Sequence, residues 1–340
     1  MHQTQKQAGR DVAMANNEYT NDGVPRERFG DVSIIVPVYN SERSLPILCE
    51  RLAAVLPELA ARYELIFVDD GSRDASWQVI SELSERYAWV SGMSLMRNFG
   101  QHNALLCGIR AARYDILVTM DDDLQHPPEE LVHLLRHLSH GFDVVYGTPV
   151  SQQHGLLRGI ASRLTKAVLQ GAMGADTATK VSAWRALRRE VCAGFESYQN
   201  TFVSIDVLLT WGTTRFSSVT VRHEPRSIGQ SNYTVGALLR HALNMLTGFS
   251  TLPLQLASFV GFFFTLFGIG VLLYVLIRYF VSGGSIPGFP FLASIIALFS
   301  GAQLFALGII GEYLARMHSR SMDRPAYVVR HSTGERPDAP

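Results

Sequence analysis

The sequence predicts an α/β domain with a mostly parallel sheet, followed by amphipathic helices and a hairpin of two membrane-spanning helices. Between residues 32 and 147, short apolar runs alternate with helical patterns, which is typical of a parallel sheet covered by helices on both faces. Further along, residues 252–277 and 279–311 contain no charged side chain. These two observations set the fold class.

The predicted sheet domain alternates strands with helices. The strands are rich in aliphatic residues and are bounded by turn residues, whereas the helices repeat apolar residues every three or four positions. We expect strands at residues 32–38, 63–70, 90–96, 116–120 and 143–147, and helices at residues 45–61, 75–87, 102–112 and 128–140. Ligands of such sheets bind beyond the carboxyl ends of the strands, so functional residues are expected there.

Each uncharged stretch is long enough to cross a bilayer, because about 20 apolar residues at a rise of about 1.5 Å span its core. We expect spans at about 252–281 and 289–314, joined by the uncharged turn SGGSIPGFP. The alternative is two core helices, which are rarely so long and evenly apolar. Five arginines lie near the open end of the hairpin: Arg240, Arg316, Arg320, Arg324 and Arg330. By the positive-inside rule, the large N-terminal part and the C-terminal end are then cytoplasmic.

The remaining segments complete the expected organisation. Residues 1–30 are polar and lack the apolar core of a signal peptide, so they are expected to be a disordered tail. A cytosolic domain over 31–233 precedes an interfacial amphipathic helix at 234–250, the hairpin at 251–316 and a cytosolic tail at 317–340. Residues 156–173 are also amphipathic and basic, and both such segments fit either the lipid headgroup layer or ordinary packing on the sheet.

Composition and motifs exclude several classes of protein. Lys and Arg total 30, and so do Asp and Glu, so the charge does not indicate a nucleic-acid-binding protein. No strand is followed by GxGxxG and no GxxxxGK[ST] occurs, which argues against dinucleotide and P-loop sites. Cys49, Cys107 and Cys192 have no metal or redox spacing, so we expect reduced thiols.

Three consecutive aspartates, Asp121, Asp122 and Asp123, follow the strand at 116–120. Their charges repel, and a divalent cation with a diphosphate would compensate them, since hard cations prefer oxygen ligands. Side chains two positions apart in extended chain point the same way, so Asp121 and Asp123 can share Mg²⁺ or Mn²⁺ while Asp122 faces elsewhere. The alternative is a loop cap.

A second acidic pair, Asp69 and Asp70, ends the strand at 63–70 and precedes the turn-forming Gly71-Ser72. In the functional interpretation, Asp70 accepts hydrogen bonds from a nucleobase and Asp69 orders the pocket. The alternative is a turn together with a cap for the next helix.

Taken in order and spacing, the motifs resemble family 2 glycosyltransferases of the GT-A fold. The resemblance extends over about residues 30–330 and is closest to polyprenyl-phosphate glycosyltransferases, the group of dolichol-phosphate mannose synthase and bacterial undecaprenyl-phosphate sugar transferases. The matching motifs are IIVPVYN (34–40), VDDGSRD (68–74), RNFGQ (97–101), MDDDLQHPPE (120–129), DVVYG (143–147), RxxGxSxY (226–233) and GEYLxR (311–316).

This resemblance implies roles for individual residues. The nucleotide would be contacted by Pro37, Tyr39, Asn40, Asp69, Asp70, Asn98, Gly100, Asp121 and Asp122. Asp121 and Asp123 would hold Mg²⁺ or Mn²⁺ on the diphosphate. Arg226 and Ser231 would meet the phosphate of a polyprenyl lipid. The resemblance also implies a UDP-sugar in preference to a GDP-sugar, a bacterial inner membrane and a homotetramer.

One segment departs from the family pattern. Where relatives carry an acidic residue in a Gly-Asp-Phe-Arg-like stretch, this chain has Ala183. Either the role has moved to Asp176 or Asp206, or no base is needed, because a phosphate monoester with a second pKa near 6 is already largely dianionic at neutral pH. Asp123, Asp206 and Asp176 are therefore the catalytic candidates. Lys180 and Arg185 are candidates for the acceptor phosphate, with solvated surface cations as the alternative.

The predicted function is inverting transfer of a sugar from a nucleotide to a polyprenyl phosphate in the membrane. A membrane-tethered sensor that binds the nucleotide sugar without transferring it is one alternative. A processive polysaccharide synthase is another, but its Gln-x-x-Arg-Trp segment and additional spans do not occur in this sequence.

Overall fold

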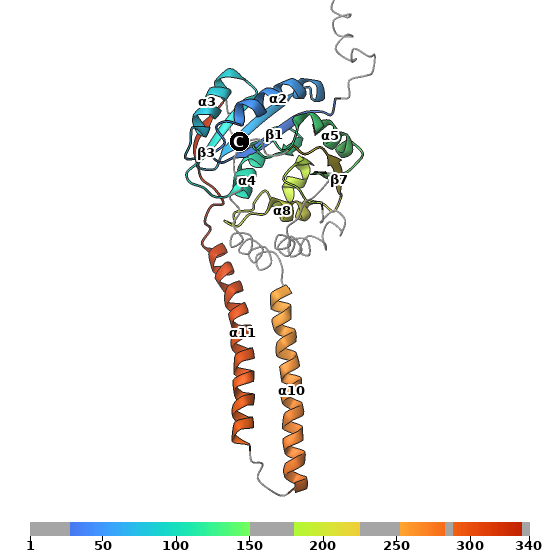
Figure 1. Cartoon of the computed structure of the whole chain (residues 1–340), viewed down its shortest axis with the longest axis vertical. Helices are drawn as coiled ribbons and strands as arrows, with labels where there is room; N and C mark the ends of the chain where they lie inside the picture. Colours follow the sequence, from blue (N-terminus) through green and yellow to red (C-terminus); the bar gives the residue numbers. More distant parts are fainter. Residues whose placement is uncertain (1–27, 150–179, 225–251, 283–287, 335–340) are drawn as a thin grey trace, which may run out of the picture. The chain divides into compact units, whose positions relative to one another are not determined.

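The computed structural model describes residues 28–149, 180–224, 252–282 and 288–334 (Figure 1). The chain divides into two compact units. The described parts of the first are residues 28–149, 180–224 and 325–334, and those of the second are residues 252–282 and 288–324. The chain thus leaves the first unit, forms the second and returns to the first.

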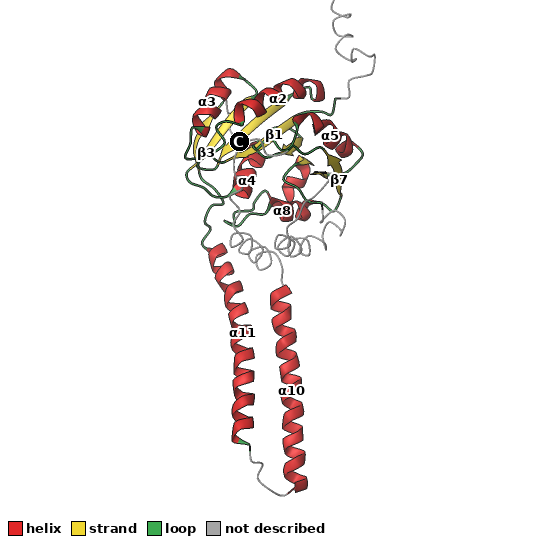
Figure 2. Ribbon diagram, in the orientation of Figure 1, coloured by secondary structure: helices red, strands yellow, loops and turns green. Residues whose placement is uncertain are grey.

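The first unit is built on an eight-stranded sheet in the order β7-β5-β6-β4-β1-β2-β3-β8. Figure 2 shows strands of this sheet in yellow, with the red helices of the unit beside them. The strands are β1 (Val32–Val38), β2 (Tyr63–Asp69), β3 (Val90–Leu95), β4 (Ile116–Thr119), β5 (Val144–Pro149), β6 (Arg185–Arg188), β7 (Phe216–Val221) and β8 (Val329–Thr333). The four neighbours β4, β1, β2 and β3 are parallel, which confirms the predicted α/β class with a mostly parallel sheet.

The four helices predicted for this unit begin and end close to the expected residues, and the structure adds two helices within residues 189–212 that were not predicted. The helices are α2 (Leu45–Leu59), α3 (Ser76–Arg86), α4 (Gln101–Ala111), the short η1 (Pro128–Glu130), α5 (Leu131–Ser139), η2 (Arg189–Phe195) and α8 (Ile205–Gly212). The helix expected at 128–140 is therefore a 3₁₀ turn followed by an α-helix.

Helices cover both faces of the sheet because successive side chains of a strand point to opposite faces. Ile34 and Val36 of β1 lie in one core cluster with Leu48 and Leu52 of α2. On the other face, α4 approaches β1 closely: a Cβ atom on Gly108 would lie 2.4 Å from Cγ2 of Ile35. Only glycine fits there, so this position sets the distance from α4 to the strands.

The strands at both ends of the parallel core were not predicted. β6 inserts between β4 and β5 and is antiparallel to both. β8 pairs antiparallel with β3, although the sequence analysis assigned residues 317–340 to a cytosolic tail. The nitrogen Nδ2 of Asn103 in α4 donates to the carbonyl oxygen of Ala326 at 2.5 Å, which fixes the returning segment.

The described part of the second unit contains α10 (Leu252–Ser282) and α11 (Phe289–Ser321). Residues 254–278 and 298–318 are long and apolar enough to cross a membrane. The two helices contact each other through Phe299 of α11, whose ring meets Phe264 and Phe267. The predicted hairpin of apolar helices is confirmed, with α11 longer than expected. The amphipathic segments at 156–173 and 234–250 lie outside the described residues.

Candidate active site

Four loops meet at the carboxyl ends of β1, β2, β3 and β4, because these parallel neighbours end on the same edge of the sheet. We call this region the donor edge and define it as residues 39–41, 69–72, 97–101 and 121–123. Hydrogen bonds connect its loops. The amide of Tyr39 donates to Oδ2 of Asp122 at 3.3 Å, and the amide of Asn40 donates to Oγ of Ser72 at 2.9 Å. The sequence motifs therefore form one site.

Asp70 holds the loop after β3. Its two carboxylate oxygens accept hydrogen bonds from the amides of Phe99, at 2.6 Å, and Gly100, at 2.8 Å. Gly100 has φ of 102°, which a side chain would strain. Burial raises the pKa of Asp70 to about 6, although the two amide bonds oppose the shift. A nucleobase would have to use the remaining lone pairs of this carboxylate.

Asp69 is also buried and orders the turn after β2. Oδ1 accepts from the amide of Ser72 at 3.0 Å, and Oδ2 accepts from the hydroxyl of Ser94 at 3.0 Å. The first turn of α3 is contacted by Asp74 instead, whose Oδ1 accepts from the amide of Ser76 at 3.0 Å. The pair Asp69 and Asp70 thus shapes the pocket loops and does not cap the next helix.

The three aspartates after β4 have different partners. Oδ1 of Asp121 accepts from Nε2 of Gln101 at 2.7 Å, and Oδ1 of Asp123 accepts from the amide of Gln125 at 3.1 Å. Asp122 meets the end of β1 through Tyr39, and burial raises its pKa to about 6. Gln101 was not singled out in the sequence, because nothing local connects it to residue 121.

A divalent cation fits this loop as a partner of a diphosphate. In the described part of the chain, no three His, Cys, Asp or Glu side chains form a metal-binding group. The ligand atoms that this loop can provide are carboxylate oxygens, which suit Mg²⁺ and Mn²⁺. Such ions are bound through one or two carboxylates together with substrate phosphates and water, which agrees with an acidic loop that is not a complete cage.

Another buried acidic residue, Asp206, lies in the first turn of α8. Its Oδ1 is 3.1 Å from Nη1 of Arg185 and accepts a hydrogen bond from the hydroxyl of Tyr146 at 3.1 Å. Arg185 is 2% exposed, so its charge needs a buried partner. Asp206 and Arg185, for which the sequence predicted different roles, therefore form an ion pair with each other.

Comparison with known proteins identifies the family. The sequence pattern of "Glycosyl transferase family 2" matches residues 33–194. A protein from Photorhabdus laumondii, named undecaprenyl-phosphate 4-deoxy-4-formamido-L-arabinose transferase, is 33% identical over 312 residues, covering 91% of this chain and 96% of its own length. Relatives of the same name from Shewanella sediminis and Pseudomonas aeruginosa are 35% and 34% identical, covering 88% and 91% of this chain and 91% and 92% of their own lengths.

The chain belongs to glycosyl transferase family 2. It is a glycosyltransferase, and the predicted resemblance to the polyprenyl-phosphate group of this family is confirmed. Among solved structures, glucosyl-3-phosphoglycerate synthase from Mycobacterium tuberculosis, crystallised with Mn²⁺, UDP and glucosyl-3-phosphoglycerate, is 19% identical with a TM-score of 0.48, covering 64% of this chain and 79% of that one.

Ala183, at which the resemblance predicts an acidic residue, lies close to the end of β4 and thus to the aspartate loop. Thr119 and Arg185 are paired between β4 and β6, and the hydroxyl of Thr119 donates to the carbonyl oxygen of Ala183 at 2.9 Å. Because the two strands are antiparallel, Asp121, two residues after Thr119, and Ala183, two residues before Arg185, follow this pair on the same side. The missing acid of this glycosyltransferase would therefore stand next to the proposed metal loop.

An aromatic wall borders the same loop and was not foreseen as a unit. The ring of His126 lies 5.1 Å from that of Trp184 and 5.4 Å from that of His223. Burial lowers the pKa of His126 to about 4, so this side chain is neutral at pH 7. Its ring packs against those of Trp184 and His223.

The other predicted residues have varied surroundings. Pro37 is buried in β1, whereas Tyr39, Asn40, Asn98 and Lys180 are exposed. The side chain of Asn40, at φ of 55°, accepts from the amide of Arg73 at 2.8 Å. Asp176, Arg226 and Ser231 lie outside the residues that the structure describes.

Proposed function

We propose that this glycosyltransferase moves a sugar from a nucleoside diphosphate to a membrane polyprenyl phosphate, with inversion at the anomeric carbon. The observation that carries the proposal is the donor edge: one acidic loop and the Asp70-bound loop meet in a chain that also has two apolar helices. The names of the family relatives support an undecaprenyl phosphate acceptor.

On the donor side, the nucleoside would lie against Tyr39, with Pro37, Asn98 and Gly100 around it and Asp69 and Asp70 fixing the loops. Asp121 and Asp123 would hold Mg²⁺ or Mn²⁺ on the diphosphate, with Asn40 and Asp122 supporting the loop. When bound, the cation offsets charge that builds on the leaving group. UDP is the proposed nucleotide, and 4-deoxy-4-formamido-L-arabinose is the first sugar to test because the relatives are named for it.

On the acceptor side, Arg226, Ser231 and Lys180 would receive the lipid phosphate. Its oxygen would attack the anomeric carbon from the face opposite the leaving diphosphate. The phosphate is largely dianionic at neutral pH, so we propose no general base in place of the missing acid at position 183. Asp206 and Arg185 would then support the site through their buried ion pair, and Asp176 is not required as a base.

The proposed location is the bacterial inner membrane, with the sheet domain and both ends of the chain on the cytoplasmic side. The arginines near the open end of the hairpin support this orientation through the positive-inside rule. A homotetramer is the proposed assembly, supported only by the family resemblance.

The decisive experiment incubates the purified full chain in lipid nanodiscs with labelled nucleotide sugars, undecaprenyl phosphate and Mn²⁺, and then extracts the lipid. We expect label in the lipid fraction and a loss of roughly 100- to 1,000-fold in the Asp123→Asn variant, at an unchanged melting temperature. Absence of labelled lipid with every donor, or full turnover by the variant, would contradict the proposal.

The alternative considered from the sequence, a membrane-tethered sensor that binds the nucleotide sugar without transferring it, would require that Ala183 has removed the transferase activity of the family. The same experiment separates the two functions. A sensor would bind labelled nucleotide with Mn²⁺ but leave the lipid fraction unlabelled.

A further inference from the structure

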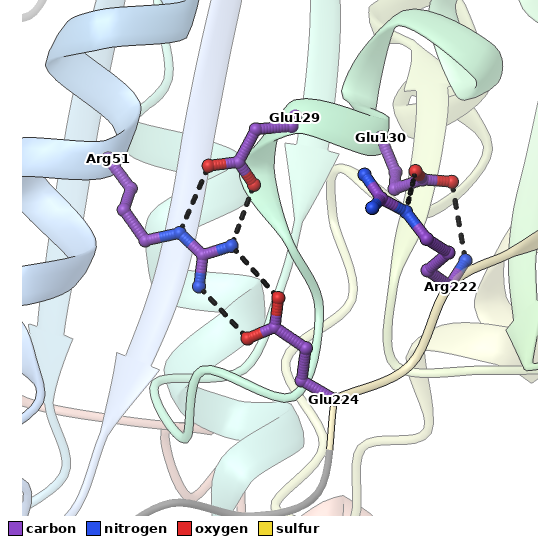
Figure 3. Close-up of polar contacts among 5 residues, drawn as sticks. All are labelled: Arg51, Glu129, Glu130, Arg222 and Glu224. Carbon is purple, nitrogen blue, oxygen red and sulfur yellow. Dashed lines mark hydrogen bonds and ion pairs between the residues drawn. The ribbon is translucent and has the colours of Figure 1, made fainter.

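One arginine joins three segments that are far apart in the sequence. Arg51 of α2 contacts Glu129 of η1 and Glu224, which follows β7 (Figure 3). Nε and Nη2 donate to the two oxygens of Glu129 at 3.1 and 2.7 Å, and Nη1 and Nη2 donate to those of Glu224 at 3.3 Å each. All three guanidinium nitrogens are thus used. We call these three residues the clasp.

Further contacts beside the clasp join two of its three segments, residues 125–130 and residues 222–224. Nε of Arg222 donates to Oε1 of Glu130 at 2.6 Å, and the amide of Glu224 donates to the carbonyl oxygen of Gln125 at 2.9 Å. Figure 3 shows both glutamates of η1 engaged, Glu129 by Arg51 and Glu130 by Arg222. The 222–224 segment therefore runs along the 125–130 segment and is fixed to it by backbone and side chain.

In the sequence, Glu129 lies close to residues proposed for the donor, and Glu224 lies close to a residue proposed for the acceptor. Upstream of Glu129 is the loop of Asp121 and Asp123, and two residues after Glu224 comes Arg226, the proposed contact of the acceptor phosphate. Leu124, which follows the aspartates, has φ of 60° and is buried in the core cluster of the sheet domain. The five residues between Asp123 and Glu129 thus include one that is held by core packing.

Overall stability does not explain the clasp. Its side chains are partly exposed, at 24% for Arg51, 44% for Glu129 and 46% for Glu224, and exposed pairs contribute little to stability. What distinguishes Arg51 is geometry, because a planar guanidinium that binds two carboxylates, each through both oxygens, fixes their relative orientation, which a lysine cannot do. We therefore expect Arg51 to set the relative position of the two carboxylates and to contribute little to the free energy of unfolding.

We propose that Arg51 is a positioning residue for sugar transfer, whose guanidinium sets the aspartate loop and residues 222–224, which lead to Arg226, at the correct separation through Glu129 and Glu224. This inference rests on the proposed function for its kinetic consequence. Arg51 itself is not placed in contact with substrate.

The chain offers a matched control. Arg62 also makes a doubly hydrogen-bonded ion pair, with Asp31, which directly precedes β1 and so lies at the opposite edge of the sheet from the aspartate loop. Arg51→Gln and Arg62→Gln remove the same chemical group from a similar contact. Only the first should matter for transfer.

The test measures sugar transfer by the arginine and glutamate variants and by wild-type protein in nanodiscs. For Arg51→Gln and Arg51→Lys we expect kcat to fall about 10- to 100-fold, with KM for the nucleotide sugar within about twofold and the melting temperature unchanged. Arg62→Gln should keep full activity. In a double-mutant cycle, Glu224→Gln should cost several-fold alone and almost nothing further when combined with Arg51→Gln.

Hydrogen exchange provides a readout that does not need activity. The amide of Glu224, bonded to Gln125, should exchange faster in Arg51→Gln than in wild-type protein or in Arg62→Gln. If wild-type protein makes no labelled lipid, the proposed function fails, and this exchange still tests the clasp. Equal exchange in both arginine variants, or equal kcat in an active enzyme, would overturn the inference.

Discussion

The carboxylates of Asp70 and Asp122 at the donor edge differ from the carboxylate of Asp206 in α8 in the groups that bind them. Asp70 accepts from two backbone amides and Asp122 from the amide of Tyr39, whereas Asp206 faces the guanidinium of Arg185. Burial raises the pKa of both Asp70 and Asp122 to about 6. Opposite charges therefore cancel within the α8 pair, whereas the several carboxylates of the donor edge would be stabilised by an added cation. Four measurements test that division.

The largest effect is expected from breaking the α8 pair. Asp206→Ala leaves the 2%-exposed Arg185 without its partner, and an unpaired buried charge costs about 3–5 kcal/mol. Denaturant unfolding of the detergent-solubilised protein, followed by tryptophan fluorescence, measures the loss. The double variant Arg185→Met/Asp206→Leu should recover most of it. A change below about 1 kcal/mol would remove the structural assignment of this pair.

The pH dependence of stability probes Asp70. Its pKa is raised in the folded state, from 3.8 to about 6, so folded protein binds more protons than unfolded protein between these values. The free energy of unfolding should therefore fall as pH rises from about 4 to 6, by up to roughly 3 kcal/mol, and level off above. Asp70→Asn should lack this part of the slope. Identical slopes in the two proteins would show that Asp70 titrates normally.

Adding ligand should stabilise the donor edge selectively. UDP with Mn²⁺ at about 100 times the dissociation constant should add about 2.7 kcal/mol to the unfolding free energy of wild-type protein, seen as a higher melting temperature. Asp121→Asn should lose this gain while keeping the melting temperature of the ligand-free protein. Arg62→Gln serves as the control that retains the gain. An undiminished shift in Asp121→Asn would place the cation elsewhere.

The smallest effect is expected from restoring the acid that family members carry. Ala183→Asp puts a fourth carboxylate beside the aspartate loop, but a dianionic acceptor phosphate needs no base. We expect kcat to rise by less than about twofold across pH 6 to 8. A rise of ten-fold or more would show that a base is missing from this chain and would strengthen the sensor interpretation of the natural sequence.

Local patterns were sufficient for much of the donor edge. The apolar runs before Asp70 and Asp121 predicted parallel strands, and parallel neighbours necessarily end together. The same reasoning could not connect Gln101 to Asp121 or Arg51 to Glu224, whose hydrogen bonds join residues 20 and 173 positions apart. Such contacts depend on side-chain reach across the finished fold.

By itself the sequence determined the strands β1 to β5 and the helices between them, the acidic loop and the apolar hairpin, because each is encoded in the spacing of neighbouring residues. Only the tertiary structure decided that β6 enters the sheet between β4 and β5, that residues 329–333 return to its edge, and that Asp206 is held by Arg185. Short strands and buried ion pairs gain their stability from partners distant in the chain, and no local periodicity encodes which partner that is.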